Sequence, residues 1–203
     1  MTWGVYFVTD PAAGAVECQA LSAARAGVAF VQLRDKSASD DDMIRLARAL
    51  KTGLATYGTR LIVNDRVDVA IAAGADGVHM GQGDGDPRHA RARIGPGLIL
   101  GLSIERQEQL ARVPEGCVDY LGVGPVRATP TKPGHAPPMG FAGLRRIASG
   151  TALPCIAIGG LGPGDARACR RAGAAGMAVV SAIARSDDPE GAARHLRSEW
   201  SAP

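Results

Sequence analysis

The chain has 203 residues, enough for one domain and for two only if both are small. Its 46% hydrophobic and 21% charged residues exclude a disordered or collagen-like protein. The formal net charge of +3 suits an anionic small ligand but is far too weak for a nucleic-acid surface, and 4% aromatic residues supply few stacking platforms. We therefore expect one globular domain, residues 1–203, that binds small molecules rather than nucleic acid.

No segment predicts export or membrane insertion. The apolar run 172–184 lies between two arginines and is shorter than the roughly 20 residues of a membrane helix. The first ten residues lack a basic segment leading into an apolar one, so no signal peptide is expected. The four cysteines show neither CxxC pairs nor zinc spacing, which indicates free thiols in a reducing compartment. We expect a cytoplasmic protein without membrane contact; a homo-oligomer is compatible with this sequence.

Short apolar runs rich in valine, isoleucine and leucine recur along the whole chain. None alternates cleanly between apolar and polar residues, which is typical of strands buried on both faces of a parallel sheet. The predicted strands are, in chain order, 5–9, 29–33, 61–64, 77–80, 98–102, 120–123, 155–158 and 177–180.

Helices are predicted between these strands, with clear signals at their ends. Ser39 precedes three aspartates and is placed to cap a helix whose positive end favours acids. Asp86-Pro87 and Asp188-Pro189 each place a capping acid before a proline at the first helical position. Helix ends before the next strand are indicated by Gly27, Gly74 and Gly173.

Eight strands that alternate with helices predict either a closed barrel or a doubly wound sheet. Polar residues or glycines follow nearly every predicted strand, whereas a doubly wound sheet would gather them at one switch point. We therefore predict a single-domain (β/α)8 TIM barrel of class α/β with its chemistry at the C-terminal strand ends. One long segment, 125–140, carries five prolines without helical or strand period, which is typical of a lid or binding loop.

A phosphate site is predicted at the ends of the last two strands. Gly159 and Gly160 follow the seventh strand, and Val180-Ser181 follows the eighth. Glycines let backbone N–H groups approach an anion, and this pair of loops is a frequent phosphate site in barrels. The alternative is that the glycines only relieve crowding at tight turns.

A second anion site is predicted on the other side of the same mouth. It combines the cations Arg34, Lys36 and Lys132 with the carboxylates Asp65 and Asp84. Mg²⁺ usually takes only one or two protein carboxylates. A magnesium–pyrophosphate site therefore explains why acidic and basic side chains occur together: the aspartates would bind the metal and the basic side chains the pyrophosphate oxygens. The alternative is a cluster of salt bridges without a ligand. Neither aspartate lies in a His-rich pattern, so a zinc hydrolase is not expected.

The histidines offer no clear catalytic base. His79, within a buried strand, is more typical of a packed barrel residue, and His135 is expected to be solvated in the long loop. There is no Ser-His-Asp order and no G-x-S-x-G elbow. A protein of this kind would act mainly by positioning reactants and stabilising the charge of a leaving group.

Several motifs, taken together and in order, resemble those of the thiamine-phosphate synthase family, in a broader group that includes thiazole tautomerase. The resemblance spans nearly the whole chain. Its most specific pieces are QLRDK at 32–36, IVNDR at 62–66, ADGVHMGQGD at 75–84, DYLGVGPV at 119–126, TPTK at 129–132 and AIGGL at 157–161. The resemblance implies condensation of 4-amino-5-hydroxymethyl-2-methylpyrimidine diphosphate with 4-methyl-5-(2-hydroxyethyl)thiazole phosphate. It also implies that pyrophosphate leaves by ionisation to a pyrimidine cation, which the thiazole nitrogen then captures.

The resemblance also implies a role for individual residues. Arg34, Lys36, Ser103 and Lys132 would be catalytic, and Asp65 and Asp84 would bind Mg²⁺. The pyrimidine diphosphate would contact Gln32, Arg34, Lys36, Asn64, Ser103 and Lys132, and Leu33 and Asp35 would also bind substrate. The thiazole phosphate would contact Thr129, Pro130, Thr131, Gly160, Val180 and Ser181.

Two other functions are weighed against this one. A thiazole tautomerase-like relative needs neither the pyrophosphate site nor the metal acids and typically loses the threonine–lysine loop. The residues that argue against it are Thr129, Thr131, Lys132, Asp65 and Asp84. A non-catalytic barrel that binds a phosphorylated metabolite would need the phosphate loops but not the acids with their cations. Fold alone would not decide between these functions.

Overall fold

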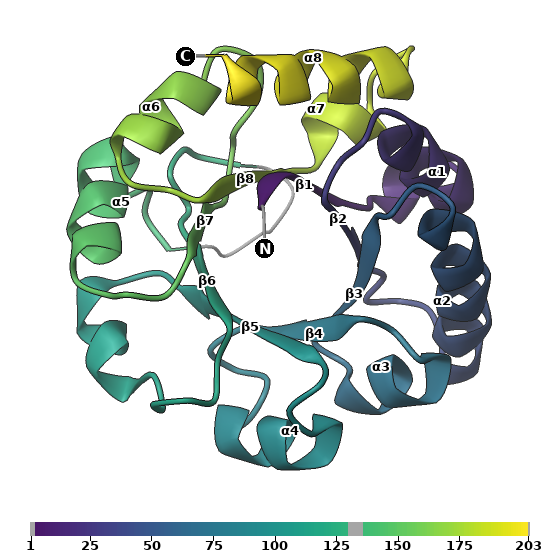
Figure 1. Cartoon of the computed structure of the whole chain (residues 1–203), viewed down its shortest axis with the longest axis horizontal. Coiled ribbons are helices and arrows are strands. Elements are labelled where there is room, and N and C mark those ends of the chain that lie inside the picture. The colour runs from purple at the N-terminus through teal and green to yellow at the C-terminus, as the bar shows by residue number, and fades with distance from the viewer. Residues whose placement is uncertain (1–2, 130–135, 203) are drawn as a thin grey trace.

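The computed structural model describes residues 3–129 and 136–202, and its strands form a closed parallel barrel in the order β1 to β8 (Figure 1). The strands are β1 Gly4–Val8, β2 Phe30–Leu33, β3 Arg60–Asn64, β4 Gly77–Met80, β5 Ile99–Ile104, β6 Tyr120–Val123, β7 Cys155–Ala157 and β8 Gly176–Val179. The prediction of a single-domain (β/α)8 TIM barrel is confirmed. All eight predicted strands are present, displaced by at most two residues at either end.

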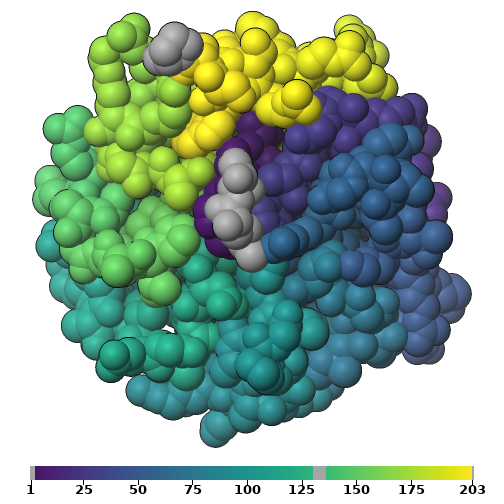
Figure 2. All heavy atoms as spheres, in the orientation of Figure 1, coloured from purple at the N-terminus to yellow at the C-terminus, as the bar shows by residue number. Residues whose placement is uncertain are grey.

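The connections between strands run outside the barrel. Their helices are η1 Pro11–Ala13, α1 Val16–Arg25, α2 Asp40–Ala55, α3 Val67–Ala73, α4 Pro87–Ile94, η2 Gln107–Arg112, α5 Gly140–Ser149, α6 Ala166–Arg171, α7 Ser181–Ala184 and α8 Pro189–Ser201. Between β5 and β6 the only helix in the described chain is the short 3-10 helix η2. The first and last long helices, α1 and α8, pack against each other, so the purple and yellow ends of the chain meet in Figure 2.

The predicted helix caps are confirmed because they depend on local hydrogen bonds. The Ser39 side chain accepts from the N–H of Asp42, and the Asp86 carboxylate accepts from the N–H of Arg88 with Pro87 at the first turn. Gly74 ends α3 in the left-handed conformation, with φ 66°. Side-chain caps of this kind satisfy N–H groups that have no partner within the helix.

Two apolar layers follow from the alternation of side chains along each strand. One layer fills the barrel itself and contains Trp3, Tyr6, Phe30, Ile62, Ile99, Tyr120, Ile156 and Ala178. The neighbours of these residues face the helices, as Val31 and Leu33 do on β2. Tyr6, Tyr120, Ile156 and Ala178 of this inner layer also line a cavity at the C-terminal strand ends.

None of the helices in the described residues has both the length and the apolar character required to cross a bilayer. The long loop predicted at 125–140 contains no helix or strand in its described parts, 125–129 and 136–139, and α5 begins at Gly140. Pro130, Thr131, Lys132 and His135 lie outside the described residues.

Candidate active site

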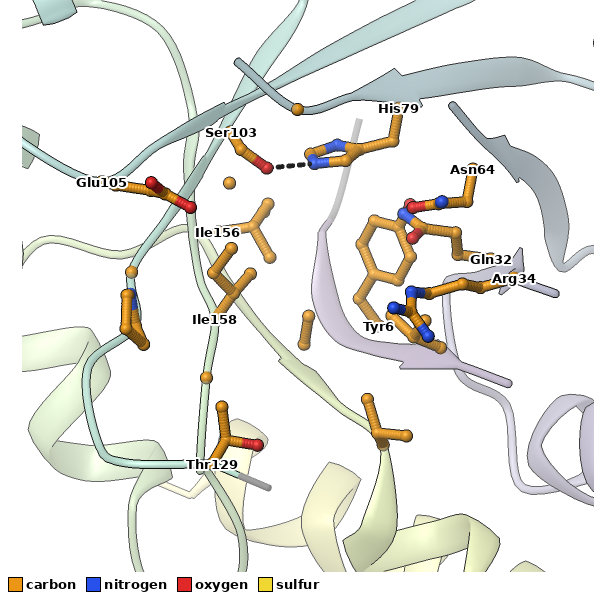
Figure 3. Close-up of a pocket in the computed structure, with 18 of the residues that line it drawn as sticks. Tyr6, Gln32, Arg34, Asn64, His79, Ser103, Glu105, Thr129, Ile156 and Ile158 are labelled. Atoms are coloured by element: carbon orange, nitrogen blue, oxygen red, sulfur yellow. Dashed lines mark hydrogen bonds between the residues drawn. The ribbon is translucent and has the colours of Figure 1, made fainter. Parts of the chain in front are cut away.

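A cavity of about 460 Å³ opens at the C-terminal ends of the strands. Every strand of the barrel contributes to its wall, from Val8 on β1 to Val179 on β8. Figure 3 shows Gln32, Arg34 and Asn64 along one side, with Ile156 and Ile158 facing them across the space. Clefts at this face carry the chemistry of characterised barrel enzymes.

Most of the residues predicted for the site meet in this cavity, although they come from seven separate strand ends. The predicted residues in its wall are Gln32, Arg34, Lys36, Asn64, Asp65, Asp84, Ser103, Thr129, Gly160, Val180 and Ser181. Pro130, Thr131 and Lys132 lie outside the described residues, so their placement stays a prediction.

Two residues of the QLRDK motif have other roles in the structure. Leu33 is fully buried between the barrel and the helices, because it alternates with Gln32 and therefore faces outward. The Asp35 carboxylate accepts hydrogen bonds from the N–H groups of Ser37 and Ala38, at 2.8 and 3.1 Å, and so shapes the turn before α2. Neither side chain lines the cavity.

An acidic pair stands at the ends of β3 and β4. Burial, followed by the adjacent Asp84 carboxylate, raises the pKa of Asp65 above its ordinary value, while Lys36 opposes the shift. The Lys36 Nζ lies 3.3 Å from an Asp65 carboxylate oxygen. Asp84 is held in place because its carboxylate accepts the N–H of Gly81 at 2.6 Å. The two acids therefore approach each other closely enough to repel, which favours a cation between them.

The backbone at Asp65 is unusual. It adopts a left-handed conformation with φ 62°, the only non-glycine residue in the described chain to do so. Its N–H donates to the carbonyl of His79 at 2.8 Å, which continues the pairing of β3 with β4 beyond the last strand residue. Such a conformation is uncommon for residues other than glycine and directs the Asp65 side chain away from the path of the strand.

The donor set of this pair fits Mg²⁺. Mg²⁺ usually takes one or two carboxylates from a protein, with water and substrate phosphate as the remaining ligands, so a pair of aspartates is enough. In the described residues no His, Cys, Asp or Glu side chain joins the pair to make a group of three. Lys36 takes part in an ion pair, as the salt-bridge interpretation requires. Half-buried Arg34 lines the cavity and forms no ion pair with any described residue.

The loop after β7 lies on the opposite side of the mouth. Gly159 and Gly160 have φ values of 90° and 65°, and a Cβ at Gly160 would lie 2.4 Å from the carbonyl oxygen of Ala128. Close packing against residues 125–128 thus requires both glycines, as the crowding interpretation predicts. Gly160 also lines the cavity together with Val180 and Ser181, so the same backbone faces the space for a ligand.

Sequence reasoning missed a row of hydrogen-bonded side chains across the cavity floor. Tyr6 and Tyr120 share a hydrogen bond of 3.0 Å, and His79 joins Tyr120 to Ser103 through its two ring nitrogens. His79 is packed and 8% exposed, as predicted. The signal for the tyrosines was weak, since a buried aromatic residue in a strand is usually core.

The fold and the cavity define a barrel enzyme with an acid pair and cations on one side of its mouth and a glycine loop on the other. The model of a protein family described as "Thiamine monophosphate synthase" matches residues 5–183. The thiamine-phosphate synthase of Albidiferax ferrireducens is 46% identical over 95% of this chain and 90% of its own, and that of Xanthobacter autotrophicus is 48% identical over 96% and 93%. The solved thiamine phosphate pyrophosphorylase from Pyrococcus furiosus superposes with a TM-score of 0.89 at 32% identity, covering 98% of this chain and 95% of that one. This chain belongs to the thiamine monophosphate synthase family and is a transferase of thiamine biosynthesis, as the motifs predicted.

Proposed function

We propose that this protein condenses 4-amino-5-hydroxymethyl-2-methylpyrimidine diphosphate with 4-methyl-5-(2-hydroxyethyl)thiazole phosphate to give thiamine phosphate and pyrophosphate. The observation that carries the proposal is the placement of two different groups of residues on opposite sides of one cavity. Asp65, Asp84, Arg34 and Lys36 gather at one side, and the glycine loop and Ser181 lie at the other. Two phosphorylated substrates are thereby brought together with their reacting ends between the two sites.

Asp65 and Asp84 are the residues that would hold Mg²⁺. The ion would supply positive charge to the diphosphate, and Arg34 and Lys36 would neutralise the remaining negative charge. Because burial and Asp84 raise the pKa of Asp65, this carboxylate binds a proton more readily than usual in the absence of a cation. Metal binding should therefore weaken as the pH falls through the pKa of Asp65.

The chain's other residues would promote a dissociative reaction. Arg34, Lys36, Ser103 and Lys132 would stabilise the charge that develops on the departing pyrophosphate. Gln32 and Asn64 would contact the pyrimidine, and the wall at Ile156 and Ile158 would exclude water while the thiazole nitrogen attacks. No side chain needs to act as a nucleophile.

Thr129, Gly160, Val180 and Ser181 would hold the phosphate of the thiazole substrate, the last three largely through backbone groups. Pro130 and Thr131 are included in this proposal on the TPTK motif alone. We further propose that residues 1–203 act as one domain in the cytoplasm.

The test is to incubate the protein with both substrates and Mg²⁺ and to measure thiamine phosphate and pyrophosphate. We expect the two products in equal amounts. Failure to form either product from protein with an intact circular dichroism spectrum would refute the assignment. Lys132→Ala should lower turnover far more than the melting temperature; a parallel loss of both would support a structural salt-bridge cluster.

A further inference from the structure

Five polar side chains form a continuous chain of hydrogen bonds across the cavity floor. Gln32 Nε2 donates to the hydroxyl of Tyr6 at 2.8 Å, and Tyr6 and Tyr120 pair through their hydroxyls at 3.0 Å. Tyr120 contacts Nδ1 of His79 at 2.8 Å. Nε2 of His79 contacts Oγ of Ser103 at 2.9 Å (Figure 3). The five residues come from five different strands, and each is at most 8% exposed.

The number of protons available along these hydrogen bonds determines which partner donates in each of them. Burial raises the pKa of both tyrosines, so each remains a neutral phenol with a single proton to donate. Tyr6 accepts from Gln32, so its own proton goes to Tyr120. Tyr120 must then donate to His79 Nδ1, which leaves the histidine proton on Nε2, facing Ser103.

The opposite direction is disfavoured while Gln32 donates. If Tyr120 donated to Tyr6, the Tyr6 proton would have no acceptor among the hydrogen bonds of the described residues, although its hydroxyl is buried. Leaving a buried donor unpaired disfavours an arrangement by about tenfold. The forward direction pairs every proton from Gln32 as far as Ser103.

We propose that Tyr6, Tyr120 and His79 are positioning residues that turn the Ser103 hydroxyl into a hydrogen-bond donor toward the cavity. His79 Nε2–H occupies an acceptor position of Oγ, so the remaining hydroxyl proton points toward the ligand space that Ser103 lines. A donor held in this way needs no reorganisation when an anion arrives. Its use on a diphosphate oxygen rests on the proposed function, whereas the proton order in the ligand-free protein does not.

The first test is the tautomer of His79 in the ligand-free protein. Long-range ¹H–¹⁵N correlation spectra of ¹⁵N-histidine-labelled protein distinguish Nε2–H from Nδ1–H, and a His79→Gln variant identifies the resonances of His79. We expect Nε2–H. An Nδ1–H tautomer in the wild-type protein would overturn the proposal, whatever the enzyme's activity.

The second test reverses the donor and acceptor in each of these hydrogen bonds. In Gln32→Glu at alkaline pH, the carboxylate accepts only, so Tyr6 must donate to it and every later hydrogen bond must reverse. His79 should then change to Nδ1–H. Gln82→Glu is the matched control, because Gln82 lines the same cavity but contacts the Ser103 carbonyl rather than the chain, and it should leave the tautomer unchanged. An unchanged tautomer in folded Gln32→Glu would contradict the proposed order.

The third test links the chain to catalysis and does not depend on how Gln32→Glu folds. Tyr120→Phe removes one hydroxyl, and we expect it to lower kcat by about fivefold to tenfold with little change in the melting temperature. In a Ser103→Ala background the same substitution should have almost no further effect, because its influence passes through the missing hydroxyl. Equal losses in both backgrounds would show that Tyr120 acts by packing alone and would refute the positioning role.

Discussion

Replacing Asp84 by Asn should stabilise the ligand-free protein while it abolishes binding of magnesium pyrophosphate. The repulsion between two carboxylates is removed, whereas an Asn oxygen is still able to accept the N–H of Gly81. Two unit charges about 4 Å apart repel by about 4 kcal/mol at an effective dielectric constant of 20. Lys36 lies 3.3 Å from Asp65, and Asp84 is exposed, so we reduce the expected gain to about 1 kcal/mol. For a chain of this size the melting temperature should rise by about 2–4 °C.

The pH dependence of this gain has a definite sign. The pKa of Asp65 is higher in the folded protein than in the unfolded chain, so the folded state binds more protons as the pH passes between the two values. The free energy of unfolding of the wild-type protein therefore falls with rising pH across that window. The advantage of Asp84→Asn should be full above the folded pKa and absent below the unfolded value of about 3.9.

Thermal melts of both proteins at neutral and acidic pH, with and without Mg²⁺ and pyrophosphate, measure every part of this prediction. The wild-type protein should gain stability from the ligands and the variant should not. A ligand-free variant that melts below the wild type at neutral pH would refute the reasoning, since Asp84 would then contribute to packing rather than to a repelling pair.

Three further predictions concern other parts of the site. Leu33→Ala should lower the free energy of unfolding by about 2–5 kcal/mol in urea melts and leave the KM values of the folded enzyme nearly unchanged, because the side chain faces the helices; a raised KM for the diphosphate would contradict this. Gly160→Ala should weaken thiazole phosphate binding in calorimetry, since its Cβ would lie 2.4 Å from a carbonyl oxygen. Gly162→Ala, whose nearest neighbour would be at 3.8 Å, serves as the tolerated control. Chelation with EDTA should weaken pyrophosphate binding and spare thiazole phosphate binding; equal loss of both would place the metal at a shared site.

The parts of the fold that depend on neighbouring residues were predictable from the sequence. The eight strands were visible as apolar runs, and the helix starts at Ser39 and Asp86 followed from side-chain hydrogen bonds that span two or three residues. The closed barrel was inferred from polar residues after nearly every strand, because strand ends share one face only when the sheet is parallel.

The candidate site was predicted in part. Asp65, Asp84 and Lys36 follow separate strands. The presence of both acidic and basic side chains at neighbouring strand ends indicated that a metal cation and an anionic ligand bind there together. Leu33 was assigned to the site because it lies within a contiguous motif, but alternation along β2 turns it away from the cavity. Asp35 was assigned on the same ground and instead closes a local turn.

The sequence by itself determined the order of the elements, their caps and the chemical types that collect at the strand ends, since these depend on local periodicity and composition. Only the tertiary structure decided which side chains meet. Tyr6 and Tyr120 are 114 residues apart and form their hydrogen bond because the barrel closes and directs both residues inward. The same closure brings His79 between Tyr120 and Ser103 and places Asp65 beside Asp84. Contacts of this kind depend on how strands far apart in the sequence come together when the barrel closes, and the local periodicity that predicts each element does not by itself give that arrangement.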